Sequence, residues 1–539
     1  MMLSLFRFCI FAIVCALPLR AATPMQQWLY LQNNLLVDKN VDEMATLFAR
    51  AAKAGYTHVL IADSKSSKLA DMDARYFKSV ERVKRLGTEN HLEIVPALFS
   101  IGYSNDLLWH DPNLIEGLPV RDALFVVRNG EARLQEQNPV TLKGGDFTDL
   151  KKWDWFDKNV SADNGAALIK DPKGENARIS QKLTLSPFRQ YHISVRVKTA
   201  EFRGTPEVKL LAGKLSLNHR DLGVKPTQDW KTHHVVFNSL SNTTAQLYLG
   251  TWGAKSGSLW FDDLTLEEVG FVNLIRRPGA PLVVKSDDDK ILSEGTDFQR
   301  LVDPLMGNKP WNGEYDVYHT PPVLKTSLPD GTKLRASYFH VATVHDGQAM
   351  ICPSEPKTIE LLRDQAQRMH KAWGAKGYMM SHDEIRVLNW CEACQKRNLD
   401  AGAILADNVR TCIKILREVN PGGRIYTWSD MFDPHHNAHK DYYLVRGDLT
   451  GSWEGLDKEV TIIPWYFEKR AESLKFFADR GHRQVIAGYY DHKPEQIRDW
   501  IEAAKPYSGV EGVMYTTWVR NFKDMEAFAA AARSTVSQH

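Results

Sequence analysis

The chain of 539 residues is 43% hydrophobic and 10% aromatic, which excludes a disordered or fibrous protein and allows a large core shared by two domains. Its 68 Lys and Arg residues are balanced by 66 Asp and Glu residues, so no strong field would attract a nucleic acid or a membrane surface. We therefore expect no nucleic-acid partner and a neutral substrate. The sequence does not indicate an oligomeric state.

The first 22 residues have the features of a secretory signal peptide. Arg7 supplies a positive charge, an apolar run of about a dozen residues follows, and the small residues Ala21 and Ala22 fit a cleavage site. No later run reaches the roughly 20 apolar residues of a transmembrane helix, so no membrane insertion of the mature chain is expected. The mature protein is therefore predicted to be secreted or periplasmic.

Short apolar segments that alternate with amphipathic segments predict the main domain. Helical periodicity is clear at 41–55, 355–374 and 400–420. The predicted buried strands are 28–32, 57–63, 92–100, 377–381, 424–430, 461–467, 483–491 and 512–518. Eight such strands with helices in most of the gaps favour an α/β fold, a (β/α)8 TIM barrel.

This rhythm is interrupted between the third and fourth predicted strands. Segments 190–200, 230–238, 245–253 and 257–268 alternate apolar and polar residues with period two. They predict an all-β jelly-roll sandwich inserted after the third barrel strand. The expected domains are the first part of the barrel at 23–140, the sandwich at 141–270, a return connection at 271–340 and the second part of the barrel at 341–539.

The predicted sandwich resembles the jelly-roll carbohydrate-binding modules that accompany glycan-degrading enzymes. The resemblance rests on GGDF (144–147), QYHISVRVKTA (190–200) and GSLWFDDLTLEE (257–268). It implies that tryptophans there could stack on sugar faces. The candidates are Trp153, Trp155, Trp252 and Trp260. For Trp260, a place in the core is the favoured alternative.

Cys391 and Cys394 form a single C-x-x-C motif. A structural zinc site needs four ligands, and no second pair stands at the spacing of a zinc finger or ribbon. A disulfide or two buried free thiols is therefore the preferred interpretation. We predict no metal site and no cofactor.

Asp383 and Glu384 stand side by side directly after an apolar strand, in GYMMSHDE (377–384). Adjacent carboxyl groups raise each other's pKa, so this arrangement is unfavourable unless the two groups have different tasks. Aromatic and acidic residues also follow the later strands. They include Trp428, Asp430, Trp465, Tyr490, Asp491 and Trp518. Rings that stack on sugars and carboxylates that accept from hydroxyls together predict glycoside hydrolysis.

With the DE pair, three segments resemble the β-N-acetylhexosaminidases of glycoside hydrolase family twenty: IVPALFSIGYS (94–104), CPSEPKTIELL (352–362) and IYTWSDMFD (425–433). The resemblance implies an oligo- or polysaccharide substrate that contains N-acetylhexosamine, hydrolysed with retention. The substrate's own 2-acetamido group would be the nucleophile. Glu384 would be the general acid and base, Asp383 would orient the acetamido group and stabilise the intermediate, and Tyr490 would donate to the acetamido carbonyl.

The chain departs from the family pattern at several positions. The family's GGDE is SHDE here, and its third-strand Asp and His correspond to Phe99 and Tyr103. The expected Trp-x-Glu after the eighth strand is Trp518-Val519-Arg520, so recognition of O4 and O6 must differ. The hydrolysed sugar could therefore be N-acetylgalactosamine or N-acetylglucosamine. The predicted substrate-binding residues are His382, Trp428, Asp430, Trp465, Asp491, Trp518 and Arg520.

Two alternatives remain open from the sequence. In one, Asp430 or Asp491 is a protein nucleophile and substrates without an acetamido group are accepted. In the other, the barrel is catalytically inactive and the protein only binds glycans. Exo or endo action is not determined by these residues.

Overall fold

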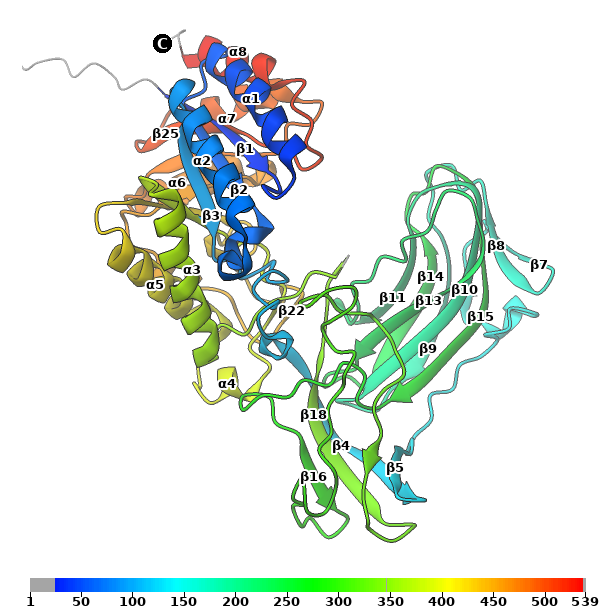
Figure 1. Ribbon diagram of the computed structural model, residues 1–539. Coiled ribbons are helices and arrows are strands. Elements are labelled where there is room, and N and C mark those ends of the chain that lie inside the picture. The colour runs from blue at the N-terminus through cyan, green and yellow to red at the C-terminus, as the bar shows by residue number, and fades with distance from the viewer. Residues whose placement is uncertain (1–24, 346, 537–539) are drawn as a thin grey trace, which may run out of the picture.

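The computed structural model describes residues 25–345 and 347–536, and eight parallel strands in it close into a barrel (Figure 1). These strands are β1 (Gln26–Gln32), β2 (His58–Ala62), β3 (Glu93–Leu98), β19 (Gly377–Met380), β21 (Arg424–Trp428), β23 (Thr461–Ile463), β24 (Gln484–Ile486) and β25 (Val510–Tyr515). Pairing of β25 with β1 closes the barrel. The predicted signal peptide at 1–22 lies outside the described residues.

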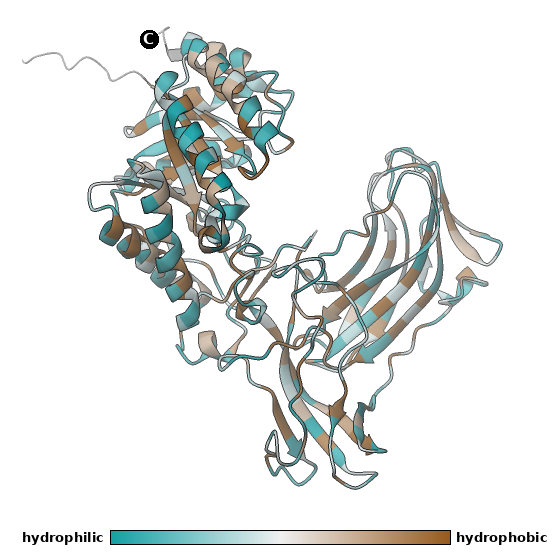
Figure 2. Ribbon diagram, viewed as in Figure 1, coloured by the Kyte–Doolittle hydropathy of each residue, from teal (hydrophilic) through white to brown (hydrophobic). Residues whose placement is uncertain are grey.

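The barrel strands are apolar because both of their faces are buried. Side chains such as Trp28, Leu60, Met379 and Met514 fill the interior, and the alternate side chains pack against the surrounding helices. Figure 2 shows this contrast: the barrel strands are hydrophobic, and the helices around them carry hydrophilic residues on their outer faces. Within the described residues, no helix combines the length and apolar character needed to span a membrane.

The helices that surround the barrel are amphipathic, as their sequence periodicity predicts. In the first of them, Val41, Met44 and Phe48 are buried at helical spacing. The helices are α1 (Asp38–Lys53), α2 (Ala74–Glu89), α3 (Pro356–Trp373), the short α4 (Glu392–Gln395), α5 (Ala401–Val419), α6 (Arg470–Asp479), α7 (Ile497–Ala504) and α8 (Met525–Val536).

The fold class predicted from the sequence, an α/β protein with a (β/α)8 TIM barrel, is wrong. The connection from β21 to β23 contains no α-helix, only the turns η5 (Asp430–Phe432) and η6 (Ser452–Gly455) and the short strand β22 (Leu444–Val445). Positive φ at Gly447 and Gly451 prevents a continuous helix there. Strands comprise 32% of the protein and helices 25%, because three antiparallel sheets accompany the barrel.

Two of those sheets form the sandwich between β3 and β19. Their orders are β13-β10-β15-β8-β7 and β12-β11-β14-β9-β6. As period two predicts, alternate residues of β10, such as Ile193, Val195 and Val197, are buried. The strands are β6 (Trp155–Phe156), β7 (Val160–Asp163), β8 (Ala166–Lys170), β9 (Ala177–Thr184), β10 (Gln190–Arg203), β11 (Pro206–Ala212), β12 (Leu215–Ser216), β13 (Gln228–Asn238), β14 (Thr244–Thr251) and β15 (Ser256–Val269).

The third antiparallel sheet is absent from the sequence prediction. It joins residues assigned to the barrel with residues assigned to the return connection, in the order β16-β18-β4-β5-β17. Its strands are β4 (Gly117–Arg128), β5 (Glu131–Leu134), β16 (Val283–Ser286), β17 (Leu324–Lys325) and β18 (Lys333–Val341). Since β4 leaves the barrel and β18 returns antiparallel beside it, this sheet joins the insertion to the barrel (Figure 1).

Candidate active site

A tight turn after β19 positions Asp383 and Glu384. Glu384 has a φ of 50°, in the left-handed region that non-glycine residues rarely adopt. Its backbone N–H donates to Oδ2 of Asp430 at 2.8 Å, which fixes the turn. A Cβ atom at Gly102 would lie 1.7 Å from the Asp383 carbonyl oxygen, so only glycine allows the loop after β3 to pass here. A strained, supported turn of this kind is typical of functional sites.

The Glu384 carboxylate has two charged or polar partners at the rim of the barrel. Arg386 places Nη2 2.7 Å from Glu384 Oε1, and the Tyr103 hydroxyl donates to Oε2. Gln348 accepts from Arg386 and also donates to the Glu384 backbone carbonyl at 2.9 Å. The Glu384 side chain is still 23% exposed, so it can reach a bound molecule.

Asp383 and Asp430 lie in a less polar environment. Burial, with the neighbouring Glu384 charge, raises the pKa of Asp383 to about 7. Burial is the main cause, and the charge of Asp383 the second cause, that raises the pKa of Asp430 to about 8. Asp430 is fully buried and also accepts from Asn437 at 3.0 Å and from the Trp465 indole at 3.4 Å. Asp430 therefore supports the turn, while Asp383 titrates near neutral pH.

Aromatic rings surround the carboxyl pair. The Tyr30 ring centroid lies 5.8 Å from that of Trp428 and 5.4 Å from that of Trp518. Burial and the nearby Asp383 charge raise the pKa of Tyr30 above its usual value. Trp518 is 45% exposed and Trp428 is only 5% exposed. Within this cluster, the Trp518 ring is therefore accessible to a ligand, and the buried Trp428 supports it. The structure thus brings together Asp383, Glu384, Trp428, Asp430, Trp465 and Trp518.

Tyr490, predicted to donate to the acetamido carbonyl, does not join this group in the structure. It is fully buried, its hydroxyl donates to the Ala487 carbonyl at 3.2 Å, and its ring packs 4.7 Å from Phe528 of α8. The adjacent Tyr489 is 48% exposed. Aromatic residues that are adjacent in sequence can point in opposite directions, and composition alone does not show which one faces the site.

His382, predicted to bind substrate, lies apart from the carboxyl pair and contacts a helix instead. The ring is fully buried, and its Nε2 lies 3.1 Å from Asn408 Oδ1 of α5. Burial lowers the pKa of His382 to about 4, which keeps the ring neutral. His382 therefore holds the end of β19 against a helix.

Asp491 and Arg520 lie around the loop that follows β25. Asp491 is 4% exposed and accepts from the Thr517 hydroxyl at 2.7 Å and from the Trp518 backbone N–H at 3.3 Å. Asp491 therefore positions Trp518 and has no open carboxylate for a ligand. Arg520 is exposed and donates to Asn33 Oδ1 at 3.3 Å, which places it on the rim beside the end of β1.

Two residues of the site were not identified from the sequence. Tyr30 belongs to β1, where its inward direction follows from the alternation of the strand. Gln348 gave no signal, because it lies in the loop between β18 and α3, far in sequence from Glu384 and Arg386, which it contacts.

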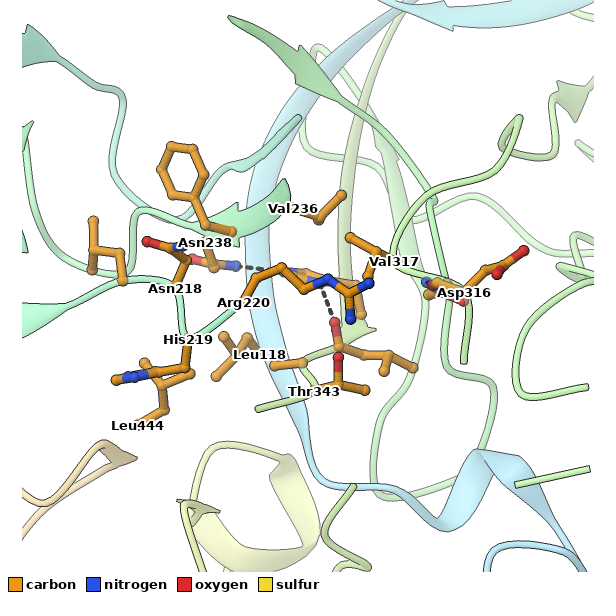
Figure 3. Close-up of a pocket in the computed structure, with 16 residues that line it drawn as sticks. Leu118, Asn218, His219, Arg220, Val236, Asn238, Asp316, Val317, Thr343 and Leu444 are labelled. Carbon is orange, nitrogen blue, oxygen red and sulfur yellow. Dashed lines mark hydrogen bonds between the residues drawn. The ribbon is translucent and has the colours of Figure 1, made fainter. Parts of the chain in front are cut away.

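A separate cavity of about 40 Å³ lies where the sandwich, the third sheet and the loop at Leu444 meet (Figure 3). Asn218, His219, Asn238 and His340 are among the residues that line it. Its volume suits one or a few water molecules and not a sugar ring. The barrel rim is therefore the better candidate for chemistry.

No protein-family model and no curated protein matches this chain. Among solved structures, it is similar to a rhamnosidase from Novosphingobium sp. PP1Y at 12% identity and a TM-score of 0.31, over 92% of this chain and 55% of the rhamnosidase. The chain thus spans about half the length of that enzyme.

Two carbohydrate-binding modules are similar to part of the chain. A family 4 module matches at 18% identity and a TM-score of 0.20, over 24% of this chain and 99% of the module. A family 61 module in complex with β-1,4-galactotriose matches at 18% identity and a TM-score of 0.18, over 23% of this chain and 91% of the module. Identity and TM-score are low in all three cases.

Proposed function

We propose that the protein is a glycoside hydrolase, and more narrowly a retaining β-N-acetylhexosaminidase that uses the 2-acetamido group of its substrate. The observation that carries the proposal is the accessible Glu384 carboxyl, bound by Arg386 and Tyr103, next to an Asp383 whose pKa is raised to about 7. Two adjacent carboxyls in different environments are the arrangement that acid and base catalysis requires.

The surroundings of the other acids support substrate assistance. Ordinary retaining enzymes need a second accessible carboxylate as the nucleophile. Asp430 is fully buried and accepts three hydrogen bonds. The Asp491 carboxylate accepts hydrogen bonds from the Thr517 hydroxyl and the Trp518 backbone N–H. These contacts argue against the alternative in which either residue attacks the sugar. The acetamido carbonyl oxygen of the substrate is then the available nucleophile.

In the proposed reaction, Glu384 gives its proton to the glycosidic oxygen while the acetamido oxygen forms a bond to C1 and the glycosidic bond breaks. Arg386 and Tyr103 stabilise the carboxylate that remains on Glu384. Ionised Asp383 accepts from the acetamido N–H and stabilises the positive intermediate. Water then attacks C1, the bond between C1 and the acetamido oxygen breaks, and the proton of the water passes to Glu384. The acetamido group and the protonated Glu384 are restored, and the two inversions at C1 leave the anomeric configuration retained.

The exposed ring of Trp518, held by Tyr30 and Trp428, supplies an apolar surface for the sugar. Arg520 occupies the rim where the resembled family has an acid, so its guanidinium would donate to outer hydroxyls instead of accepting from them. This substitution favours no single epimer, and both N-acetylgalactosamine and N-acetylglucosamine remain within the proposal.

The test is hydrolysis of 4-nitrophenyl β-glycosides of N-acetylglucosamine, N-acetylgalactosamine, glucose and galactose. Wild type is compared with Glu384→Gln, Asp383→Asn and a control, Glu418→Gln, which alters an exposed acid paired with Arg363. We expect turnover of acetamido sugars only, lost in both site variants and retained in the control, and inhibition by a thiazoline mimic of the intermediate. Turnover of plain hexosides alone would contradict substrate assistance. No turnover of any substrate would favour a glycan-binding protein.

A second experiment separates the roles of the two acids. A 2,4-dinitrophenyl leaving group departs without protonation. On such a substrate, Glu384→Gln should therefore regain much of the wild-type rate of glycosidic bond cleavage. Asp383→Asn should not recover, because the acetamido group would still be poorly oriented. Recovery of Asp383→Asn alone would reverse the two roles.

A further inference from the structure

Four buried side chains from distant parts of the sequence meet outside the candidate active site. Glu116 immediately precedes β4, Cys352 precedes α3, and Cys391 and Cys394 lie at α4. All four are fully buried, and their three sulfur atoms and one carboxylate oxygen lie within 4.8 Å of one another. We name this group the Cys3Glu cluster.

The distances within the Cys3Glu cluster match the edges of a tetrahedron around one ion. With Zn–S of about 2.3 Å and Zn–O of about 2.0 Å, tetrahedral ligands are separated by roughly 3.8 Å between sulfurs and 3.5 Å between sulfur and oxygen. The Cys352 sulfur lies 3.4 Å from that of Cys391 and 3.7 Å from that of Cys394. Glu116 Oε2 lies 3.3 Å from the Cys391 sulfur and 3.7 Å from the Cys394 sulfur.

The orientation of Glu116 is the second observation. Its Oε1 accepts from the backbone N–H groups of Trp390 and Cys391, each at 2.7 Å. These bonds fix the carboxylate so that Oε2 faces the sulfurs. A buried carboxylate is unfavourable unless it is paired or coordinates a metal, and hydrogen bonds that orient a ligating carboxylate are typical of metal sites.

We propose that Glu116, Cys352, Cys391 and Cys394 bind one Zn²⁺ ion in a structural site. Four protein ligands leave no open position for water or substrate, which separates structural from catalytic zinc. Thiolates with a tetrahedral arrangement favour zinc over harder cations. When the ion binds, protons of the thiols pass to solvent. A disulfide would use two of the sulfurs and would leave the third thiol and the oriented carboxylate without a role.

The ion would fasten the insertion to the candidate active site. Glu116 lies where the chain leaves the barrel, Cys352 lies where it returns, and the C-x-x-C segment follows the Asp383–Glu384 turn. Arg277, in the return connection, binds the same junction by donating to the Asn113 and Ile115 carbonyls at 2.8 and 3.1 Å. Without zinc, the three segments would be joined by such hydrogen bonds, by the buried ion pair between Arg277 and Glu355, and by packing.

The test is metal analysis of the full chain purified without chelator. We expect elemental mass spectrometry to find about one zinc ion per chain. Removal of zinc by a chelator should lower the Tm, and addition of zinc should restore it. Cobalt added to the zinc-free protein should give thiolate-to-cobalt absorption in the near ultraviolet. A zinc-free protein with a disulfide that links two of the three cysteines would overturn the proposal, and so would a Tm unaffected by chelator.

Variants give an independent check with a matched control. Cys391→Ser should lose the bound zinc, and Glu116→Gln should bind it more weakly, with a dissociation constant at least tenfold higher. Cys412→Ser removes a buried cysteine of α5 that lies outside the Cys3Glu cluster, so its zinc content should equal that of wild type. If Cys391→Ser does not fold, the cobalt spectrum of wild type still decides the matter. Equal zinc content in all three variants would overturn the assignment of ligands.

Discussion

The barrel rim and the inserted sandwich both carry tryptophans that are exposed or half-buried, but the neighbours of these rings differ. At the rim, the exposed Trp518 packs on Tyr30, which in turn lies near Asp383. In the sandwich, Trp155 and Trp252 flank Arg178, whose guanidinium lies 5.2 and 5.7 Å from their rings and pairs with Asp157. Under the proposed function, the sandwich would bind a sugar at these rings, whereas the rim would both bind and cleave it.

Glu384→Gln should produce the largest effect and should affect only the barrel rim. Loss of the proton donor and base is expected to lower kcat by roughly 10²- to 10⁴-fold on nitrophenyl glycosides. Affinity for an insoluble glycan should stay within experimental error, because the sandwich is unchanged. Kinetics and a pull-down on the same preparation measure both quantities. A parallel loss of glycan affinity would show that the rim and not the sandwich dominates binding.

The pH dependence should report Asp383. Its pKa is raised to about 7, so the carboxyl is mostly protonated below that pH and cannot accept from the acetamido N–H. We expect kcat/KM to fall as the pH drops through about 7. Because Asp430 titrates close to the same range, the transition belongs to the coupled pair. The residual activity of Asp383→Asn should lack this dependence, while Glu418→Gln keeps it. A rate independent of pH from 6 to 8 in wild type would contradict the role of Asp383.

Trp155→Ala, at an exposed ring, and Trp252→Ala, at a half-buried ring, should weaken glycan binding by roughly two- to tenfold each, the usual value of one stacking contact. Hydrolysis of small nitrophenyl substrates should be unaffected. Trp153→Phe is a useful contrast, because Trp153 is buried, stacks on Phe147 and donates to the Gly144 carbonyl, so it cannot contact a sugar. Affinity electrophoresis in gels with soluble glycans measures the difference. Unchanged migration of both alanine variants would remove the sugar-binding role of this sheet.

The sequence predicted the features that depend on local pattern. Apolar strands, helix periodicity and the alternation in β10 are all found, because each reflects burial of a face of one element. The sequence assigned no helix to the connection between β21 and β23, but it did not predict the third sheet at all. That sheet pairs residues 117–134 with residues from 283 to 341, and no local signal records a pairing over that separation.

The candidate site shows the same limit. Asp383 and Glu384 were found because two adjacent acids after an apolar strand are unusual in themselves. The directions of His382 and Tyr490 depend on α5 and α8, which pack behind the strands and provide their partners. The Cys3Glu cluster was missed for a similar reason. Only the C-x-x-C pair is close in sequence, and Glu116 and Cys352 reach it through the fold.

Tyr490→Phe should have the smallest effect. The hydroxyl lies in the core and donates to the Ala487 carbonyl, so its removal should lower the free energy of unfolding by about 1 kcal/mol and leave kcat unchanged. Urea denaturation and kinetics of the same protein measure the two quantities. Tyr103→Phe is the matched comparison, because it removes a hydroxyl that donates to Glu384 and should lower kcat. If Tyr490→Phe lowered kcat more than Tyr103→Phe did, the Tyr490 side chain would have to face the substrate during turnover. That result would contradict its buried position in the structure.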